Sequence, residues 1–136
     1  MKDKKKIIFV CAENAGRSQM AGAFFNAYAK NRGYNAESAG TVPAGEVNPA
    51  VIEVMKEKGI DMLNAKPKQF DESRIDEYAR IISFGCLLKE AFSTDIQKRI
   101  EDWVTDDPKG KPVEDVRIIR DSIEKKVRVL IEELLL

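Results

Sequence analysis

The stretch CAENAGRS, residues 11–18, places a cysteine, an arginine and a serine where they could act together on an oxyanion. The chain contains no histidine. A nucleophilic Cys11 would therefore owe its reactivity to backbone dipoles and to arginine or lysine rather than to an imidazole. Arg17 carries a planar fork of donors that suits two oxygens of a tetrahedral anion. Ser18 can donate a hydrogen bond to the Cys11 sulfur as negative charge builds on it or leaves it.

The flanking residues predict a strand before this stretch and a helix after it. Residues 6–10 are β-branched and aromatic, as in a short buried strand. From Arg17 apolar residues recur at helical spacing, and Gly33 is expected to end the helix. A loop that enters a helix N-terminus aims backbone N–H groups and the positive end of the helix dipole at one point. A thiol ionises readily in such surroundings, so we expect Cys11 to be a thiolate at neutral pH.

We therefore expect the loop to bind an oxyanion beside the Cys11 sulfur, an arrangement suited to in-line attack on phosphorus or arsenic. The expected oxyanion-binding residues are Ala12, Glu13, Asn14, Ala15, Gly16, Arg17 and Ser18. Gly16 is expected to leave room for backbone to approach the ligand, and Asn14 tolerates the unusual dihedral angles of a tight loop. Glu13 would repel an oxyanion if it pointed inward, so we expect it to face solvent or to make a structural contact.

The rest of the chain alternates predicted strands and helices. Strands are predicted at 35–40, 79–84 and 101–104. Helices are predicted at 50–58, after an Asn-Pro pair that suits a helix start, and from Pro112 onward. In the last helix the apolar residues recur every three or four positions: Val116, Ile119, Ile123, Val127, Leu130 and Leu134.

This alternation predicts an α/β fold, a three-layer sandwich in which a four-stranded parallel sheet is flanked by helices on both faces. Ligands bind such sheets beyond the carboxyl ends of the strands. Cys11, Cys86 and Asp107 all follow predicted strands, so we expect all three on that edge. No repeat or linker suggests a second domain, and we expect one domain over residues 1–136.

Composition excludes several classes of function. The chain has 23 Lys plus Arg and 23 Asp plus Glu, so neither nucleic acid nor an acidic membrane surface is an expected partner. No segment approaches the ~20 apolar residues of a membrane span, and a cytoplasmic location is expected. In a reducing compartment the two cysteines are expected to be free, catalytic or transiently paired. Without histidine or close cysteine spacing, no metal site and no cofactor is expected.

The stretch CAENAGRS resembles the phosphate-binding loop of low molecular weight protein tyrosine phosphatases and of the arsenate reductases that share their fold. RSQMAGAFFN, ESAGT, VNPAVIEVMKEKGID and DDPKG resemble the arsenate reductase branch. Gln19 follows the Arg-Ser pair where phosphatases usually have proline, and Lys109 follows Asp-Pro where they usually have an aromatic residue. The resemblance implies an arsenate reductase with Cys11 as nucleophile, Arg17 as oxyanion clamp and Asp107 as general acid.

The resemblance leaves the acid and the second thiol open. From the residues alone TDDPKG is a turn, and Asp106 is the alternative acid. Thioredoxin-coupled reductases pass the reaction from the nucleophile to a second and a third cysteine, but this chain has no third cysteine. Cys86 lies one residue after the position expected for the second. It could attack the Cys11 adduct to give a Cys11–Cys86 disulfide, or be a buried apolar residue.

An external thiol reductant, namely thioredoxin, glutaredoxin or a small thiol, could replace Cys86 in that step. Two other functions fit the same loop. A phosphatase would share the first step and end with water attacking a cysteinyl phosphate. A non-catalytic domain would bind phosphate-type oxyanions without reaction.

Overall fold

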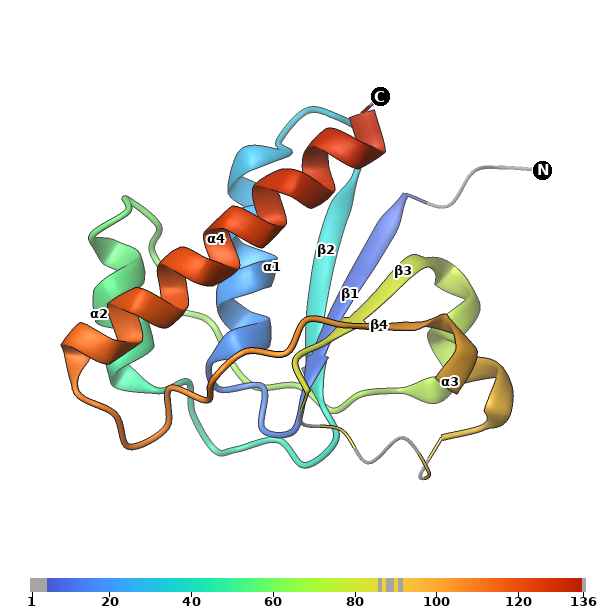
Figure 1. The fold of residues 1–136 in the computed structure, drawn as a ribbon, viewed down its shortest axis with the longest axis horizontal. Helices are drawn as coiled ribbons and strands as arrows, with labels where there is room; N and C mark the ends of the chain where they lie inside the picture. The colour runs from blue at the N-terminus through green and yellow to red at the C-terminus, as the bar shows by residue number, and fades with distance from the viewer. Residues whose placement is uncertain (1–4, 86, 88–89, 91, 136) are drawn as a thin grey trace.

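The computed structural model describes residues 5–85, 87, 90 and 92–135 (Figure 1). Its elements follow in the order β1 (Lys6–Cys11), α1 (Arg17–Tyr28), β2 (Asn35–Gly40), α2 (Pro49–Lys56), the 3-10 helix η1 (Glu72–Glu77), β3 (Tyr78–Ser83), α3 (Thr94–Arg99), β4 (Ile100–Asp102) and α4 (Val113–Leu135). Within the described residues, β1 to β4 form one parallel sheet in the order β2-β1-β3-β4. The predicted α/β fold is confirmed.

Strand β1 lies inside the sheet, which is why its sequence KIIFVC is apolar almost throughout. It pairs with β2 on one side, where Cys11 lies opposite Gly40, and with β3 on the other. The chain leaves β1 toward β2 and later returns to β3. The strand order therefore reverses between β1 and β3, and such a reversal is where α/β sheets bind ligands, beyond the carboxyl ends of the strands.

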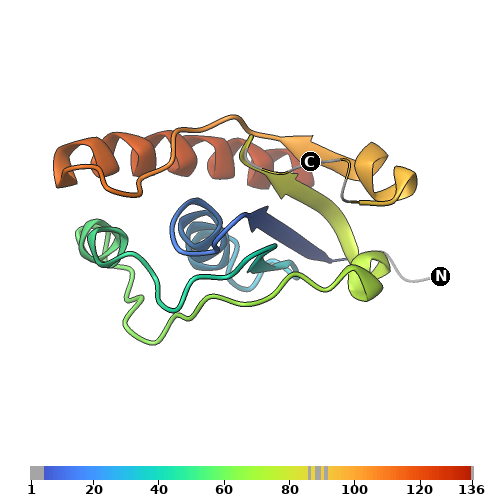
Figure 2. The same ribbon diagram turned by 90° about the horizontal axis from the view of Figure 1, so that it is seen from below.

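Helices cover both faces of the sheet: α1, α2 and α4 lie on one face, and the shorter η1 and α3 lie on the other (Figure 2). Alternate β1 side chains, Ile7 and Phe9, pack in the core cluster formed with α1, α2 and α4. Ile8 and Val10 point to the other face. There they pack with apolar residues from η1, α3 and the neighbouring segments, including Phe70, Ile75, Phe92 and Ile96. The two short helices, η1 and α3, were not predicted.

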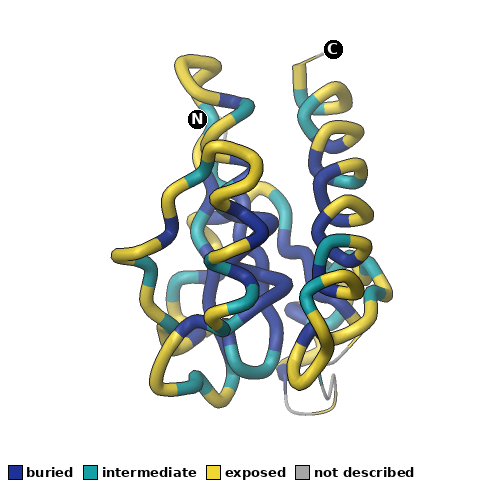
Figure 3. The backbone as a smooth tube through the Cα atoms, turned by 90° about the vertical axis from the view of Figure 1, so that its left-hand side faces the viewer, coloured by how far each residue is buried: buried dark blue, intermediate teal, exposed yellow. Residues whose placement is uncertain are grey.

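The C-terminal helix α4 lies across α1 and α2 and contacts both (Figure 1). Its buried side runs along the molecule while its other side is exposed (Figure 3). The predicted apolar stripe forms that buried side: Val116, Ile119, Ile123, Val127 and Leu130 are buried, and Leu134 packs at its end. The predicted long amphipathic helix is confirmed.

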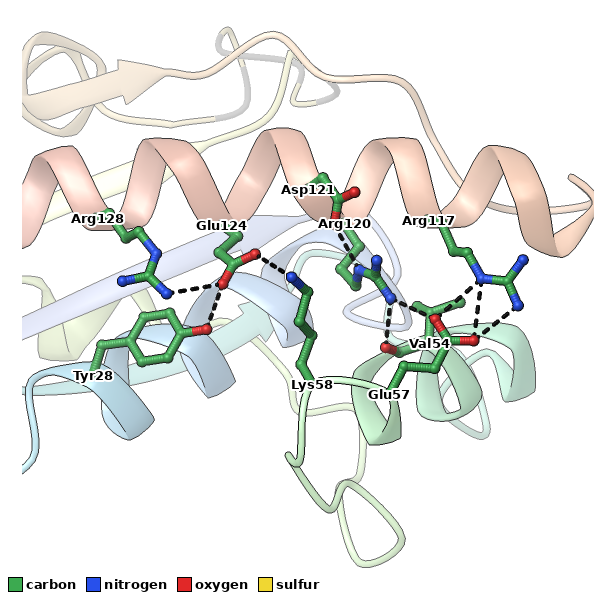
Figure 4. Close-up of polar contacts among 9 residues, drawn as sticks. All are labelled: Tyr28, Val54, Glu57, Lys58, Arg117, Arg120, Asp121, Glu124 and Arg128. Carbon is green, nitrogen blue, oxygen red and sulfur yellow. Dashed lines mark hydrogen bonds and ion pairs between the residues drawn. The ribbon is translucent and has the colours of Figure 1, made fainter.

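Polar side chains connect α4 to the helices beneath it (Figure 4). Glu124 accepts hydrogen bonds from Tyr28 of α1 and Arg128, and pairs with Lys58 just after α2. Arg120 donates to the backbone carbonyl of Val54 and to the Glu57 carboxylate. These contacts fix how α4 lies across α1 and α2 in addition to its apolar packing.

Some predicted boundaries differ from those observed. Helix α1 ends at Tyr28 rather than near Gly33. The N–H of Ala29 still bonds to Phe25, and the chain then turns through Asn31 and Gly33, both with positive φ. Gly33 therefore belongs to the turn after the helix rather than to its end.

Candidate active site

Residues 11–18 form a loop from the end of β1 into the start of α1, and this loop borders a pocket of about 310 Å³. Cys11 and Arg17 both line the pocket, although they are only 3% and 8% exposed. The pocket lies at the sheet edge where the carboxyl ends of the strands meet, as the sequence predicted. Its described lining is Cys11, Ala12, Glu13, Ala15, Gly16, Arg17, Ala44, Glu46, Asn48, Pro49, Asp107, Pro108, Lys109 and Gly110.

Backbone hydrogen bonds turn the carbonyl groups of the loop toward the segment that follows β2. The carbonyl oxygens of Cys11, Ala12, Glu13 and Ala15 accept from the N–H groups of residues 41, 42, 44 and 48. A carbonyl oxygen facing the pocket would repel an anion. Because these four are bonded to the neighbouring segment, the loop presents its N–H side and the N-terminus of α1 to the pocket.

Two residues let the loop and β2 come this close. Asn14 is fully buried and adopts φ 52°, the left-handed conformation that Asn tolerates better than most residues. On β2, a Cβ atom at Gly40 would lie 2.6 Å from the Ala12 carbonyl oxygen and 2.9 Å from the Asn14 nitrogen. Any larger residue at Gly40 would therefore push the loop away from the sheet.

The Cys11 sulfur has two hydrogen-bond partners from its own loop. Ser18 Oγ lies 2.8 Å from Cys11 Sγ, and the backbone N–H of Asn14 donates to the sulfur at 3.2 Å. Ser18 Oγ also accepts from Asn14 Nδ2 at 2.7 Å. Since this contact occupies the hydroxyl oxygen as an acceptor, the single hydroxyl hydrogen of Ser18 can point at Cys11, which suits a thiolate.

Arg17 is held by the ends of two strands. Its Nη1 donates to the carbonyl oxygens of Thr105 at 2.9 Å and of Phe84 at 3.3 Å, residues that follow β4 and β3. Its Nη2 lies 3.6 Å from Asp107 Oδ2. These contacts fix the plane of the guanidinium beside Cys11, as binding of two oxygens of one anion requires.

Asp107 lines the pocket and Asp106 is not among its described lining residues. Asp107 Oδ1 accepts from the backbone N–H of Lys109, which holds the carboxylate in a tight turn. Gly16 also makes room for the loop that carries Asp107, because a Cβ atom there would lie 2.7 Å from Pro108 Cγ.

Glu13 makes a structural contact at the rim of the pocket. Its Oε2 pairs with Lys109 Nζ at 2.9 Å, and the two side chains are 40% and 71% exposed. The hydrogen bond to Glu13 raises the pKa of Lys109 above its ordinary value of 10.5. This pair joins the oxyanion loop to the loop of Asp107 on the solvent side of the pocket.

The structure brings the predicted Cys11, Arg17, Ser18 and Asp107 together, whereas Cys86 lies outside the described residues. Sequence reasoning missed Glu46, Asn48 and Pro49, which line the pocket. Asn48 had a helix-capping signal, and it does cap α2. No signal in the sequence pointed to its second place, in the wall of the pocket.

In the described part of the chain, no group of three or more His, Cys, Asp or Glu residues could hold a metal ion. Within the same residues, no helix is long and apolar enough to cross a membrane.

The sequence of the chain is similar to those of known proteins over nearly its whole length. Residues 6–135 match the model of the family described as low molecular weight phosphotyrosine protein phosphatase. A glutaredoxin arsenate reductase of Synechocystis sp. is 32% identical over 131 residues, which cover 96% of this chain and 98% of that protein.

Solved structures of both reductases and phosphatases resemble this one. An arsenate reductase from Archaeoglobus fulgidus has a TM-score of 0.78 at 33% identity, covering 93% of this chain and 98% of its own. An arginine phosphatase from Geobacillus stearothermophilus has a TM-score of 0.83 at 27% identity, covering 95% of this chain and 92% of its own. The fold is thus shared by enzymes of different chemistry.

Proposed function

The chain belongs to the low molecular weight phosphotyrosine protein phosphatase family, and within this family we propose that it is an arsenate reductase. The observation that carries the proposal is the pocket: Cys11, Arg17 and Asp107 meet there, and its described lining contains no aromatic side chain to hold a tyrosine ring. The pocket therefore suits a small inorganic oxyanion better than an aryl phosphate. The relative from Synechocystis sp., which is named a glutaredoxin arsenate reductase, also supports arsenate as the substrate.

In the first step the Cys11 thiolate attacks the arsenic atom of arsenate. A sulfur–arsenic bond forms while an arsenic–oxygen bond breaks, and Asp107 donates a proton so that this oxygen departs as water. Arg17 and the N–H groups of the loop bind the other oxygens. The product is an arsenic(V) adduct on Cys11.

In the second step a second thiolate attacks the sulfur of Cys11. The sulfur–arsenic bond breaks and its electron pair stays on arsenic, which leaves as arsenite, arsenic(III). The two sulfurs, oxidised by two electrons, form a disulfide. The second thiol comes from Cys86 or from an external thiol such as glutathione, glutaredoxin or thioredoxin, and the two sources predict different disulfides on Cys11.

The test is steady-state formation of arsenite from arsenate with glutathione plus glutaredoxin, or with thioredoxin, as reductant. We expect arsenite from the wild type and none above background from Cys11→Ser, because a serine hydroxyl is neither a comparable nucleophile nor able to form the disulfide. Cys86→Ser separates the two sources. Loss of turnover with every reductant would assign the second thiol to Cys86, and retained turnover would assign it to the external thiol.

The rival function is hydrolysis of phosphate monoesters. It shares the Cys11 attack but needs water as the second nucleophile and no thiol. Fast thiol-independent hydrolysis of p-nitrophenyl phosphate without any arsenite formation would contradict the reductase proposal. We expect the opposite order of activities, with arsenate the better substrate in kcat/KM.

A further inference from the structure

Gln19, one residue beyond the oxyanion loop, is buried and makes contacts that the reaction described above does not use. It is 6% exposed. Its Nε2 donates to Asn14 Oδ1 at 3.0 Å and to the backbone carbonyl of Lys66 at 3.0 Å. The backbone N–H of Lys68 donates to the same Asn14 oxygen at 2.9 Å.

From these contacts we infer that Gln19 is a positioning residue that orients the hydrogen bond of Ser18 toward the Cys11 sulfur. The inference rests on the proposed function only in that Cys11 reacts as a thiolate. Gln19 acts through Asn14 and then Ser18, and has no part in binding the substrate.

The direction of every hydrogen bond in this chain is set by two backbone groups. The carbonyl of Lys66 can only accept, so the Gln19 amide must present its NH₂ group there and, with the second hydrogen, to Asn14. The N–H of Lys68 can only donate, so Asn14 must present its oxygen to it. The Asn14 NH₂ group is thereby left to face Ser18.

The orientation of Asn14 decides what Ser18 can do. With the Asn14 NH₂ group against Ser18 Oγ, the hydroxyl hydrogen of Ser18 is available to the Cys11 sulfur 2.8 Å away. If the Asn14 amide were turned over, its oxygen would face Ser18 Oγ. The hydroxyl hydrogen would then bond to Asn14, and the sulfur would lose a donor that favours its charged form.

The decisive variant is Gln19→Glu, which keeps the size of the side chain and replaces the donor by an acceptor. The introduced carboxylate would face two acceptors, Asn14 Oδ1 and the Lys66 carbonyl, and would favour the turned-over Asn14. The measurement is the rate of Cys11 alkylation by iodoacetamide between pH 5 and pH 9, read by mass spectrometry of the Cys11 peptide. We expect the midpoint of the pH profile to move up by about one pH unit or more.

Three variants make this measurement specific. Gln69→Glu adds the same charge in the neighbouring segment, where Gln69 donates to the carbonyls of Gly40, Thr41 and Phe70, and should leave the midpoint in place. Gln19→Met removes the donor while Lys68 still holds Asn14, so it should give a smaller upward shift. In a Ser18→Ala background Gln19→Glu should add little, because both changes remove the same hydrogen bond.

An unshifted midpoint in both Gln19 variants would overturn the inference, as would a full additional shift in the Ser18→Ala background. Thermal unfolding of each variant shows whether the fold is kept, and two destabilised Gln19 variants with unmoved midpoints would assign Gln19 a structural role only. Alkylation needs no arsenate. A protein that formed no arsenite but showed the expected shifts would therefore refute the proposed function and leave the role of Gln19 standing.

Discussion

Asp106 and Asp107 are neighbours in sequence but differ in place, since Asp107 lines the pocket 3.6 Å from Arg17 and Asp106 is not among the described lining residues. We predict that Asp107→Asn lowers kcat for arsenite formation by about 10²-fold or more, because the departing oxygen loses its proton donor. Asp106→Asn should stay within about 2-fold of wild type, as expected for a surface change. Steady-state kinetics of the two variants side by side measures the difference. Equal losses in both would contradict the assignment of Asp107.

The sequence predicted the residues of the oxyanion loop better than the distant residues that contact them. Cys11, Arg17 and Ser18 stand within eight residues, and the chemistry of their types suggests an oxyanion site before any fold is known. The strand pattern placed Asp107 at the same sheet edge as Cys11, but its role as general acid came only from the family resemblance, because its contact with Arg17 joins residues far apart in the chain. Gln19 was noticed as a mark of the reductase branch, but its contacts depend on the path of residues 66–68, which no local pattern indicates.

The loop of Cys11 and the loop of Asp107 lie in close contact at Gly16. A Cβ atom at Gly16 would lie 2.7 Å from Pro108 Cγ. We predict that Gly16→Ala separates the loop of Cys11 from the loop of Asp107 and lowers kcat about 10-fold or more, at a cost of about 1–3 kcal/mol in the free energy of unfolding. Urea unfolding and turnover together measure both effects. Gly45→Ala is the matched control, since a Cβ atom at Gly45 meets nothing within 4 Å.

An active, normally stable Gly16→Ala variant would show that the two loops can separate without loss of activity or stability.

The helices and strands themselves were mostly predictable from the sequence. Strand 35–40 has the observed bounds, and the predicted helices before Gly59 and after Pro112 are present. Helices η1 and α3 are six residues each, too short for helical periodicity to be visible. The approach of Pro108 to Gly16 was not predicted, because a glycine in sequence does not show which neighbour approaches it.

The packing of the whole molecule includes ion pairs between helices: Glu57, at the end of α2, accepts hydrogen bonds from Arg117 and Arg120 of α4 (Figure 4). The hydrogen bonds from these two arginines lower the pKa of Glu57 from 4.5 to about 2. A carboxylate with a lowered pKa contributes stability that is present above its unfolded pKa and is lost as the pH falls toward the folded one. This contribution should therefore be full above about pH 5 and disappear as the pH approaches about 2.

We predict that Glu57→Gln lowers the urea midpoint of unfolding at pH 7, and that its difference from wild type shrinks between pH 4.5 and pH 2. The side chains of Glu57 and Arg117 are exposed, so 1 M NaCl should also reduce the difference. Glu132→Gln, an exposed change on α4, serves as control. A difference that is constant with pH would assign the effect of Glu57 to packing.

The parallel sheet was predictable from the alternation of strands and helices. Its strand order and the contacts of Glu57 were not, because they depend on how distant segments pack.

The most direct measurement of the central claim is the state of Cys11 after one turnover. Reduced protein is mixed with arsenate and one equivalent of glutathione, quenched with acid, and analysed for arsenite and for disulfides by peptide mass spectrometry. We predict that Cys11 is in a disulfide, with Cys86 or with glutathione, and that the amount of arsenite equals the amount of that disulfide. Cys11 recovered as a free thiol with no arsenite formed would contradict it.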